Sequence, residues 1–270
     1  MRIVVLACGS AGNASLFEAE GTSVLIDAGI APRTLEARLA AADARLPDAI
    51  VITHAHQDHV GHALRLARRL KIPIHVSEAT ARTPTLHGRE EITIFSAREP
   101  FAIGKLTIAP TPLPHDAAQV ALVVEGGGRR AAIVTDLGEV PPGLRSHLAR
   151  CDVVLIESNH DLEMLQSGAY PAFLKRRIGS ARGHLSNAQA HALLRTLPVE
   201  THTVVLMHLS KSNNHPEIAL ESAQDALSGR RVRLLAATQD ASLVLEAAPT
   251  ERSPLLPASR GRPGQLSLFG

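Results

Sequence analysis

The sequence contains the stretch Ile50-Val51-Ile52-Thr53-His54-Ala55-His56-Gln57-Asp58-His59. Its first three residues are β-branched and predict a short buried strand that ends at Thr53. Four side chains that can bind metal follow within six residues, and we expect them on a loop at the carboxyl edge of that strand. Imidazole and carboxylate ligands without a thiolate suit zinc, manganese or iron in a hydrolytic site. Any one of these residues could belong to a polar turn, but the four together favour a metal site.

Further along the chain, other short apolar runs also end on residues that can bind metal. The rigid segment Pro112-Leu113-Pro114 leads to His115, and the run 133–135 ends on Asp136. The runs 153–156 and 204–207 end on Glu157 and His208. Because α/β proteins commonly place their sites at the carboxyl edge of the strands, we expect these side chains to lie together in a single site.

The spacing His-x-His-x-Asp-His after a strand resembles the signature of the metallo-β-lactamase superfamily. The resemblance implies an α/β fold, an αββα sandwich, with two divalent metal ions, zinc or manganese. It assigns His54, His56 and His115 to the first metal and Asp58, His59 and His208 to the second, with Asp136 bridging both. It also counts Asp58 among the catalytic residues and makes Asp27 a carboxylate that supports the metal loop.

The segment Gly183-His184-Leu185-Ser186-Asn187 carries a further candidate. Ser186 and Gln189 form a capping-box pattern, which predicts a helix starting just after His184 and leaves that histidine on a loop. His184 resembles the non-ligand histidine of phosphodiesterases and nucleases in the superfamily, which donates a proton to the leaving oxygen. Glu157 stands where such enzymes carry the carboxylate that orients this histidine. The alternatives are a surface-loop histidine and a structural carboxylate.

The pattern of strands and helices up to about residue 104 recurs up to residue 247, which predicts a hydrolase domain over residues 1–247. Residues 248–264 are rich in Pro, Ser, Arg and Gly and are expected to form a flexible linker. The pentapeptide after it resembles the peptide by which bacterial replication and repair proteins dock on the DNA sliding clamp. Its residues are Gln265, Leu266, Ser267, Leu268 and Phe269. The alternative is a tail that packs back on the body.

The composition argues against a broad nucleic-acid-binding surface. The net charge is +2, and the residues before Pro249 carry as many acidic as basic side chains. With no Trp, one Tyr and five Phe, we expect no aromatic platform for stacking bases. The apolar run from Ile3 to Cys8 is too short for a signal peptide or a membrane span. Cys8 and Cys151 fit no redox or zinc spacing, so we expect reduced cysteines and a cytoplasmic protein.

Four segments resemble the YycJ-like branch of the superfamily, which is similar to 5′-to-3′ DNA exonucleases. These segments are residues 9–15, 157–161, 183–187 and 208–210. The resemblance covers residues 1 to about 245 and implies a two-metal DNA nuclease acting in replication or repair, tethered to the clamp. A small-molecule phosphodiesterase or thioester hydrolase is the alternative within the same chemistry. A third alternative is a non-catalytic binding module with the same fold. The full set of ligand residues argues against it.

Overall fold

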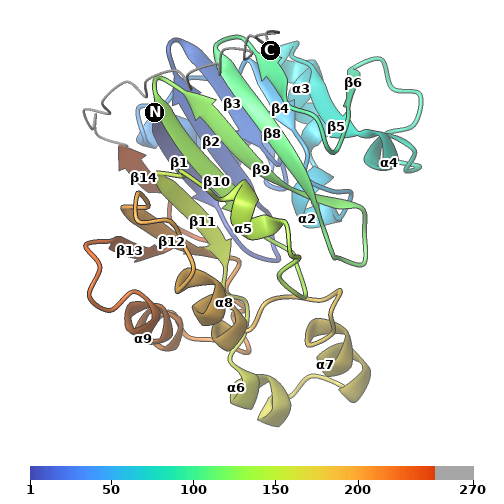
Figure 1. The fold of residues 1–270 in the computed structure, drawn as a ribbon. Helices are drawn as coiled ribbons and strands as arrows, with labels where there is room; N and C mark the ends of the chain where they lie inside the picture. Colours follow the sequence, from blue (N-terminus) through green and yellow to red (C-terminus); the bar gives the residue numbers. More distant parts are fainter. Residues whose placement is uncertain (247–270) are drawn as a thin grey trace, which may run out of the picture.

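The computed structural model describes residues 1–246. Within them, two seven-stranded sheets face each other and helices cover their outer faces (Figure 1). The predicted αββα sandwich is therefore confirmed. The predicted linker, residues 248–264, and the clamp-binding-like peptide, residues 265–269, lie outside the described residues.

The first sheet has the strand order β14-β1-β2-β3-β4-β5-β6. Strands β3, β4, β5 and β6 run parallel, so the carboxyl ends of β3 and β4 meet at one edge. The bounds are β1 Arg2–Ala7, β2 Ala14–Ala19, β3 Thr22–Ile26, β4 Ala49–Val51, β5 Ile74–Ser77, β6 Ile92–Phe95 and β14 Leu243–Glu246.

The second sheet has the strand order β13-β12-β11-β10-β9-β8-β7. Strands β10 to β13 run parallel, whereas β7, β8, β9 and β10 form an antiparallel meander. The bounds are β7 Phe101–Ile103, β8 Leu106–Leu113, β9 Gln119–Gly126, β10 Arg129–Val134, β11 Val153–Glu157, β12 Thr203–Met207 and β13 Arg233–Ala236.

The helices fall into two covering layers and a projecting segment. Buried leucines of α1 and α3 pack on the first sheet, and buried residues of α8 and α9 pack on the second. Helices α6 and α7 project beyond the end of the sheets (Figure 1), and α7 buries none of its residues. The bounds are α1 Pro32–Ala41, α2 Gln57–Val60, α3 Ala63–Leu70, α4 Glu78–Ala81, α5 Leu144–His147, α6 Leu162–Ser167, α7 Ala172–Ile178, α8 Asn187–Leu194 and α9 Pro216–Ala226.

The core between the sheets consists mainly of aliphatic side chains. Ile3, Val51, Leu122 and Val205 are fully buried there, together with Phe17. The central strands are buried on both faces because helices cover the side that faces away from the partner sheet. This frame holds the parallel strand ends in fixed positions at one edge.

One local detail differs from the sequence-based expectation, and one agrees with it. The predicted metal loop contains a helical turn, α2, whose amides bond back to the carbonyls of His56 and Gln57. Strand β14, from the second half of the chain, pairs antiparallel with β1 of the first sheet. The capping box of Ser186 and Gln189 is present at the start of α8, as predicted.

Candidate metal centre

Residues of the types that bind metal ions lie at the ends of the parallel strands. Asp27 follows β3, His54 follows β4, Asp136 follows β10 and His208 follows β12. Asp27, Asp136 and His208 adopt φ angles of 62°, 57° and 56°. This left-handed conformation is costly for residues other than glycine, and such strain tends to persist at functional sites. Here it turns the chain sharply as it leaves the sheet edge.

His54, His56 and His115 form what we term the first ligand set, since one ligand atom from each lies within 4.8 Å of the others. The Nδ1 of His54 lies 3.1 Å from Thr53 Oγ1, and the Nδ1 of His115 lies 3.1 Å from the Gly183 carbonyl oxygen. Neutral groups therefore fix both rings through Nδ1. The side chain of His56 is 34% exposed, so this set opens toward solvent.

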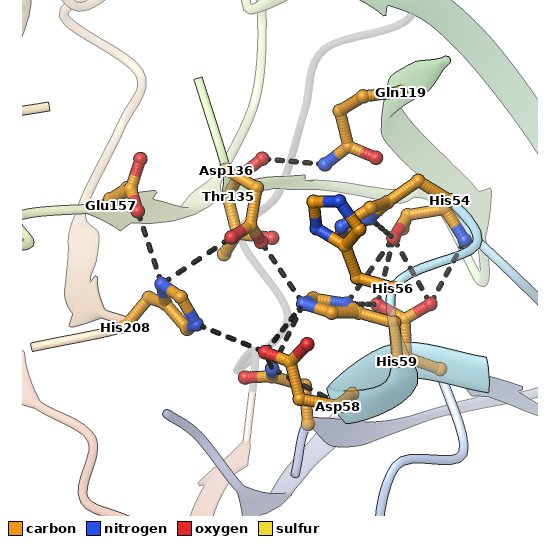
Figure 2. A network of polar contacts seen from close by, with 12 residues as sticks. His54, His56, Asp58, His59, Gln119, Thr135, Asp136, Glu157 and His208 are labelled. Carbon is orange, nitrogen blue, oxygen red and sulfur yellow. Dashed lines mark hydrogen bonds and ion pairs between the residues drawn. The ribbon is translucent and has the colours of Figure 1, made fainter. Parts of the chain in front are cut away.

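Asp58, His59 and His208 form the second ligand set by the same criterion. A carboxylate holds the Nδ1 of each imidazole: Asp27 Oδ2 lies 2.7 Å from His59, and Glu157 Oε1 lies 3.1 Å from His208. The opposite ring nitrogens then face Asp58 Oδ2, at 3.5 Å and 3.6 Å (Figure 2). Such carboxylate–histidine pairs orient metal-binding imidazoles.

Asp136 adjoins both ligand sets. It also groups with His54 and His59 as a possible metal-binding cluster, and its Oδ2 lies 3.2 Å from His59 Nε2 (Figure 2). The backbone beside it is held by a residue that the sequence did not single out: the buried Gln119 donates its Nε2–H to the Thr135 carbonyl at 2.6 Å. The position of Asp136 is therefore fixed from behind.

The donors present fit divalent metal ions. Within residues 1–246, the buried atoms without a hydrogen bond include His54 Nε2, His208 Nε2 and Asp136 Oδ2, whose one close contact is the ion pair with His59 Nε2. Buried polar atoms without partners are rare and costly, and a bound cation would satisfy these three. A thiolate does not compete, because burial raises the pKa of Cys8 to about 11 and its Sγ accepts a hydrogen bond from the His208 amide.

The two ligand sets have opposite electrostatics. Burial, with the neighbouring His59, lowers the pKa of His54 well below its ordinary value, and burial also lowers the pKa of His115. Burial acts on His59 in the same sense, but Asp27 and Asp136 outweigh it and raise the pKa of His59 well above its ordinary value. His54 and His115 in the first set therefore favour the neutral imidazole, whereas His59 in the second set favours the protonated form.

His184 and Glu157 lie in direct contact. The Nδ1 of His184 is 2.8 Å from Glu157 Oε1, and the buried Glu157 Oε2 accepts hydrogen bonds from the amides of Leu137 and Leu185. Burial lowers the pKa of His184, but Glu157 outweighs it and raises that pKa. His184 is 22% exposed and lines a cavity of about 250 Å³ together with residues of both ligand sets. Its ring can therefore meet a ligand bound there.

Three residues at this cavity were not found by sequence reasoning. Asp116 Oδ1 lies 3.2 Å from both His56 Nε2 and His115 Nε2, and Arg177 Nη2 lies 2.6 Å from Asp116 Oδ2. Tyr170 lines the same cavity. The position of Asp116 directly after His115 was a usable signal. Tyr170 and Arg177 belong to the segment around α7, which has no motif, and only the fold brings them to the site.

Comparison with known proteins identifies the family. Residues 22–209 match the model of the β-lactamase superfamily domain. The exodeoxyribonuclease YycJ of Bacillus anthracis is 32% identical over 235 residues, which cover 83% of this chain and 88% of that protein. The exodeoxyribonuclease WalJ of Streptococcus pneumoniae (strain D39) is 34% identical over 226 residues, which cover 80% of this chain and 84% of that protein.

The structure is also similar to a solved metallo-β-lactamase fold. YhfI from Bacillus subtilis aligns with a TM-score of 0.71 at 18% identity, covering 91% of this chain and 99% of that one. At this identity the likeness concerns the fold alone. Among the described residues, every helix is too short or too polar to cross a membrane.

Proposed function

The chain belongs to the metallo-β-lactamase superfamily and is a metal-dependent hydrolase, and we propose that it is a DNA exonuclease, with 5′-to-3′ polarity, acting in DNA replication or repair. The observation that carries this proposal is the pair of adjoining ligand sets joined by Asp136, with three buried ligand atoms that need a partner. The choice of DNA is supported by the two relatives, which are named exodeoxyribonucleases.

We assign one divalent ion, zinc or manganese, to each ligand set. His54, His56 and His115 would hold the first, and Asp58, His59 and His208 the second, with Asp136 shared. Two such cations activate water as a nucleophile and stabilise charge on the phosphate oxygens. The chain's own part is to fix the ligand geometry, through Asp27 behind His59 and Glu157 behind His208.

His184 would act as the proton donor for the leaving oxygen. Glu157 holds its Nδ1, so its Nε2 remains for a group bound in the cavity. In this assignment Glu157 is a positioning residue that orients His184 and His208 through one carboxylate oxygen. Asp58 serves as a ligand and adds negative charge beside His59 and His208. A positioned acid contributes roughly 10²- to 10⁴-fold to such a reaction.

We further propose three functional parts along the chain. Residues 1–247 would be the hydrolase domain, residues 248–264 a linker, and Gln265 to Phe269 a peptide that docks on the bacterial sliding clamp in the cytoplasm. The support is the sequence of the pentapeptide and the balanced charge of the body, which supplies no general attraction to DNA. Tethering would raise the local concentration of DNA instead.

Parallel cleavage assays test the proposed activity. The substrates are 5′-labelled single- and double-stranded DNA, RNA and bis-p-nitrophenyl phosphate, each with zinc, with manganese and with a chelator. We expect metal-dependent release of nucleotides from DNA. Turnover of bis-p-nitrophenyl phosphate without cleavage of DNA would favour a small-molecule phosphodiesterase. Full DNA cleavage in chelator would contradict the metal assignment.

Clamp binding tests the tether separately. The intact protein should bind a purified bacterial sliding clamp, whereas a version ending at Gly264 should not. Both versions should hydrolyse bis-p-nitrophenyl phosphate at the same rate, because the change leaves residues 1–264 intact. Equal clamp binding by the two versions, or none by either, would reject the tether without touching the proposed chemistry.

A further inference from the structure

A cleft of about 590 Å³ lies directly beside the cavity of the metal centre. His115 and Asp116 line both spaces, so the cleft and the cavity adjoin at these two residues. Loops of both sheets line it: the turn from β5 into α4, the β6–β7 loop and the β8–β9 loop. The cleft is therefore built by the same frame that fixes the ligand sets.

Three arginines line this cleft, namely Arg82, Arg98 and Arg182. Among the described residues, no carboxylate lies within ion-pair distance of any of them. The acidic residues in its lining are Glu78 and Asp116, and Asp116 is already paired with Arg177. The cleft is thus locally positive, although the body of the protein is balanced in charge.

A further hollow adjoins the cleft. This hollow, of about 530 Å³, shares Glu78 and Arg82 with the cleft and adds Arg89. Ile94, whose surface is 58% exposed, lies in the same hollow. The cleft and the hollow together therefore contain four arginines and one large exposed apolar side chain.

We propose that this cleft, with Arg82, Arg98 and Arg182, holds the phosphate backbone of a single DNA strand next to the bond being cut. The inference rests on the proposed nuclease function and names the path of its substrate. Grooves that bind single strands follow the backbone with cationic side chains, and such contacts to phosphates position the strand without reading its sequence. A substrate limited to one phosphodiester would fill the cavity of about 250 Å³ and leave this cleft empty.

The test is a double variant, Arg82→Gln/Arg98→Gln, in the full chain. Arg182 is left unchanged because its Nε donates to the His115 carbonyl at 3.0 Å and so supports a proposed ligand. KM and kcat are measured on bis-p-nitrophenyl phosphate and on single-stranded DNA of 2 to about 20 nucleotides. The upper length exceeds the site sizes of single-strand grooves. For the parent protein, KM should fall as the DNA lengthens.

In the double variant, KM should no longer fall as the DNA lengthens. Its KM for the longest DNA should be raised about tenfold or more, and its kcat should change little. The salt slope of log(kcat/KM) should decrease by about 0.7 for each lost phosphate contact. Arg82→Lys/Arg98→Lys, which keeps the charges, should restore most of the affinity. Arg65→Gln, at an exposed position of α3, is the matched control and should change neither KM for DNA nor the salt slope.

Two failures can be told apart. If the parent protein cleaves DNA and the double variant keeps the same length dependence and salt slope, the cleft is not the strand path. If the parent protein hydrolyses bis-p-nitrophenyl phosphate but no DNA, the proposed function itself is wrong. A melting temperature equal to that of the parent protein confirms that the double variant is folded, and Arg98→Gln alone serves where it is not.

Discussion

The two ligand sets lie side by side but are held in different ways. In the first set, a hydroxyl and a backbone carbonyl contact the Nδ1 atoms of His54 and His115. In the second set, the carboxylates of Asp27 and Glu157 contact the Nδ1 atoms of His59 and His208. Both sets contain two buried residues and one half-buried residue, which is His56 in the first set and Asp58 in the second.

The pKa directions follow this difference. Burial lowers the pKa of His54 and His115. Burial also acts on His208, but Asp136, Asp58 and Glu157 raise its pKa well above the ordinary value. Carboxylates behind an imidazole increase its basicity and strengthen its metal bond. We therefore expect the second set to bind its ion more tightly, and the first set to exchange its ion more readily with solvent.

The largest effect is expected at the residue shared by both sets. Asp136→Ala should lower kcat/KM on DNA by about 10³-fold or more, because the proposed two-metal chemistry needs both ions together. Elemental analysis should show metal lost from both sets. The control is Asp225→Asn on α9. The carboxylate of Asp225 is 80% exposed, so this change should leave kcat/KM and the metal content unaltered. Loss of only one ion with activity retained would show that the sets work independently.

His184 should matter for the rate and not for metal content. His184→Ala should lower kcat by roughly 10²- to 10⁴-fold, as expected for loss of a positioned acid. Both sets should keep their ions, since His184 belongs to neither. The loss should shrink with a p-nitrophenyl leaving group, which needs no protonation. An equal loss with p-nitrophenyl and alkyl leaving groups would rule out proton donation.

The difference in metal affinity can be measured with two matched carboxylate changes. Asp27→Asn removes the charge behind His59 and should weaken binding of the more tightly held ion by about 10- to 100-fold. Asp116→Asn removes a half-buried carboxylate beside His56 and His115, where solvent screens the charge, and should weaken binding of the other ion less. Metal titration by calorimetry gives both affinities. A larger effect of Asp116→Asn would reverse the proposed order of the two sets.

The sequence predicted that these candidate ligands lie together, because its signals are local. Ligand residue types directly after apolar strands, as at His54, Asp136 and His208, need only the rule that parallel strands share an edge. The sandwich follows from the same strand pattern, and the helix after His184 from the capping box at Ser186.

The features that the sequence did not reveal depend on contacts between distant segments. Tyr170 and Arg177 line the cavity because the segment around α7 lies near the strand ends. No sequence motif indicated this position, although Tyr170 is the one tyrosine of the chain. In the sequence, nothing distinguishes Arg82 and Arg98 from ordinary surface residues. The folded loops of both sheets bring them to one cleft. Strand β14 pairs with β1, which no local pattern indicates.

The smallest expected effect lies behind Asp136, at Gln119. Gln119→Leu keeps the size of this buried side chain but removes its hydrogen bond to the Thr135 carbonyl, so unfolding should become easier by about 1–2 kcal/mol. For a domain of this size, about 1 kcal/mol corresponds to a melting temperature lower by roughly 2–4 °C. Because Asp136 adjoins both ligand sets, the affinities for both ions should fall together and only slightly. Calorimetry on the same variant measures the two affinities, and an effect confined to one set would mean that Asp136 does not bridge them.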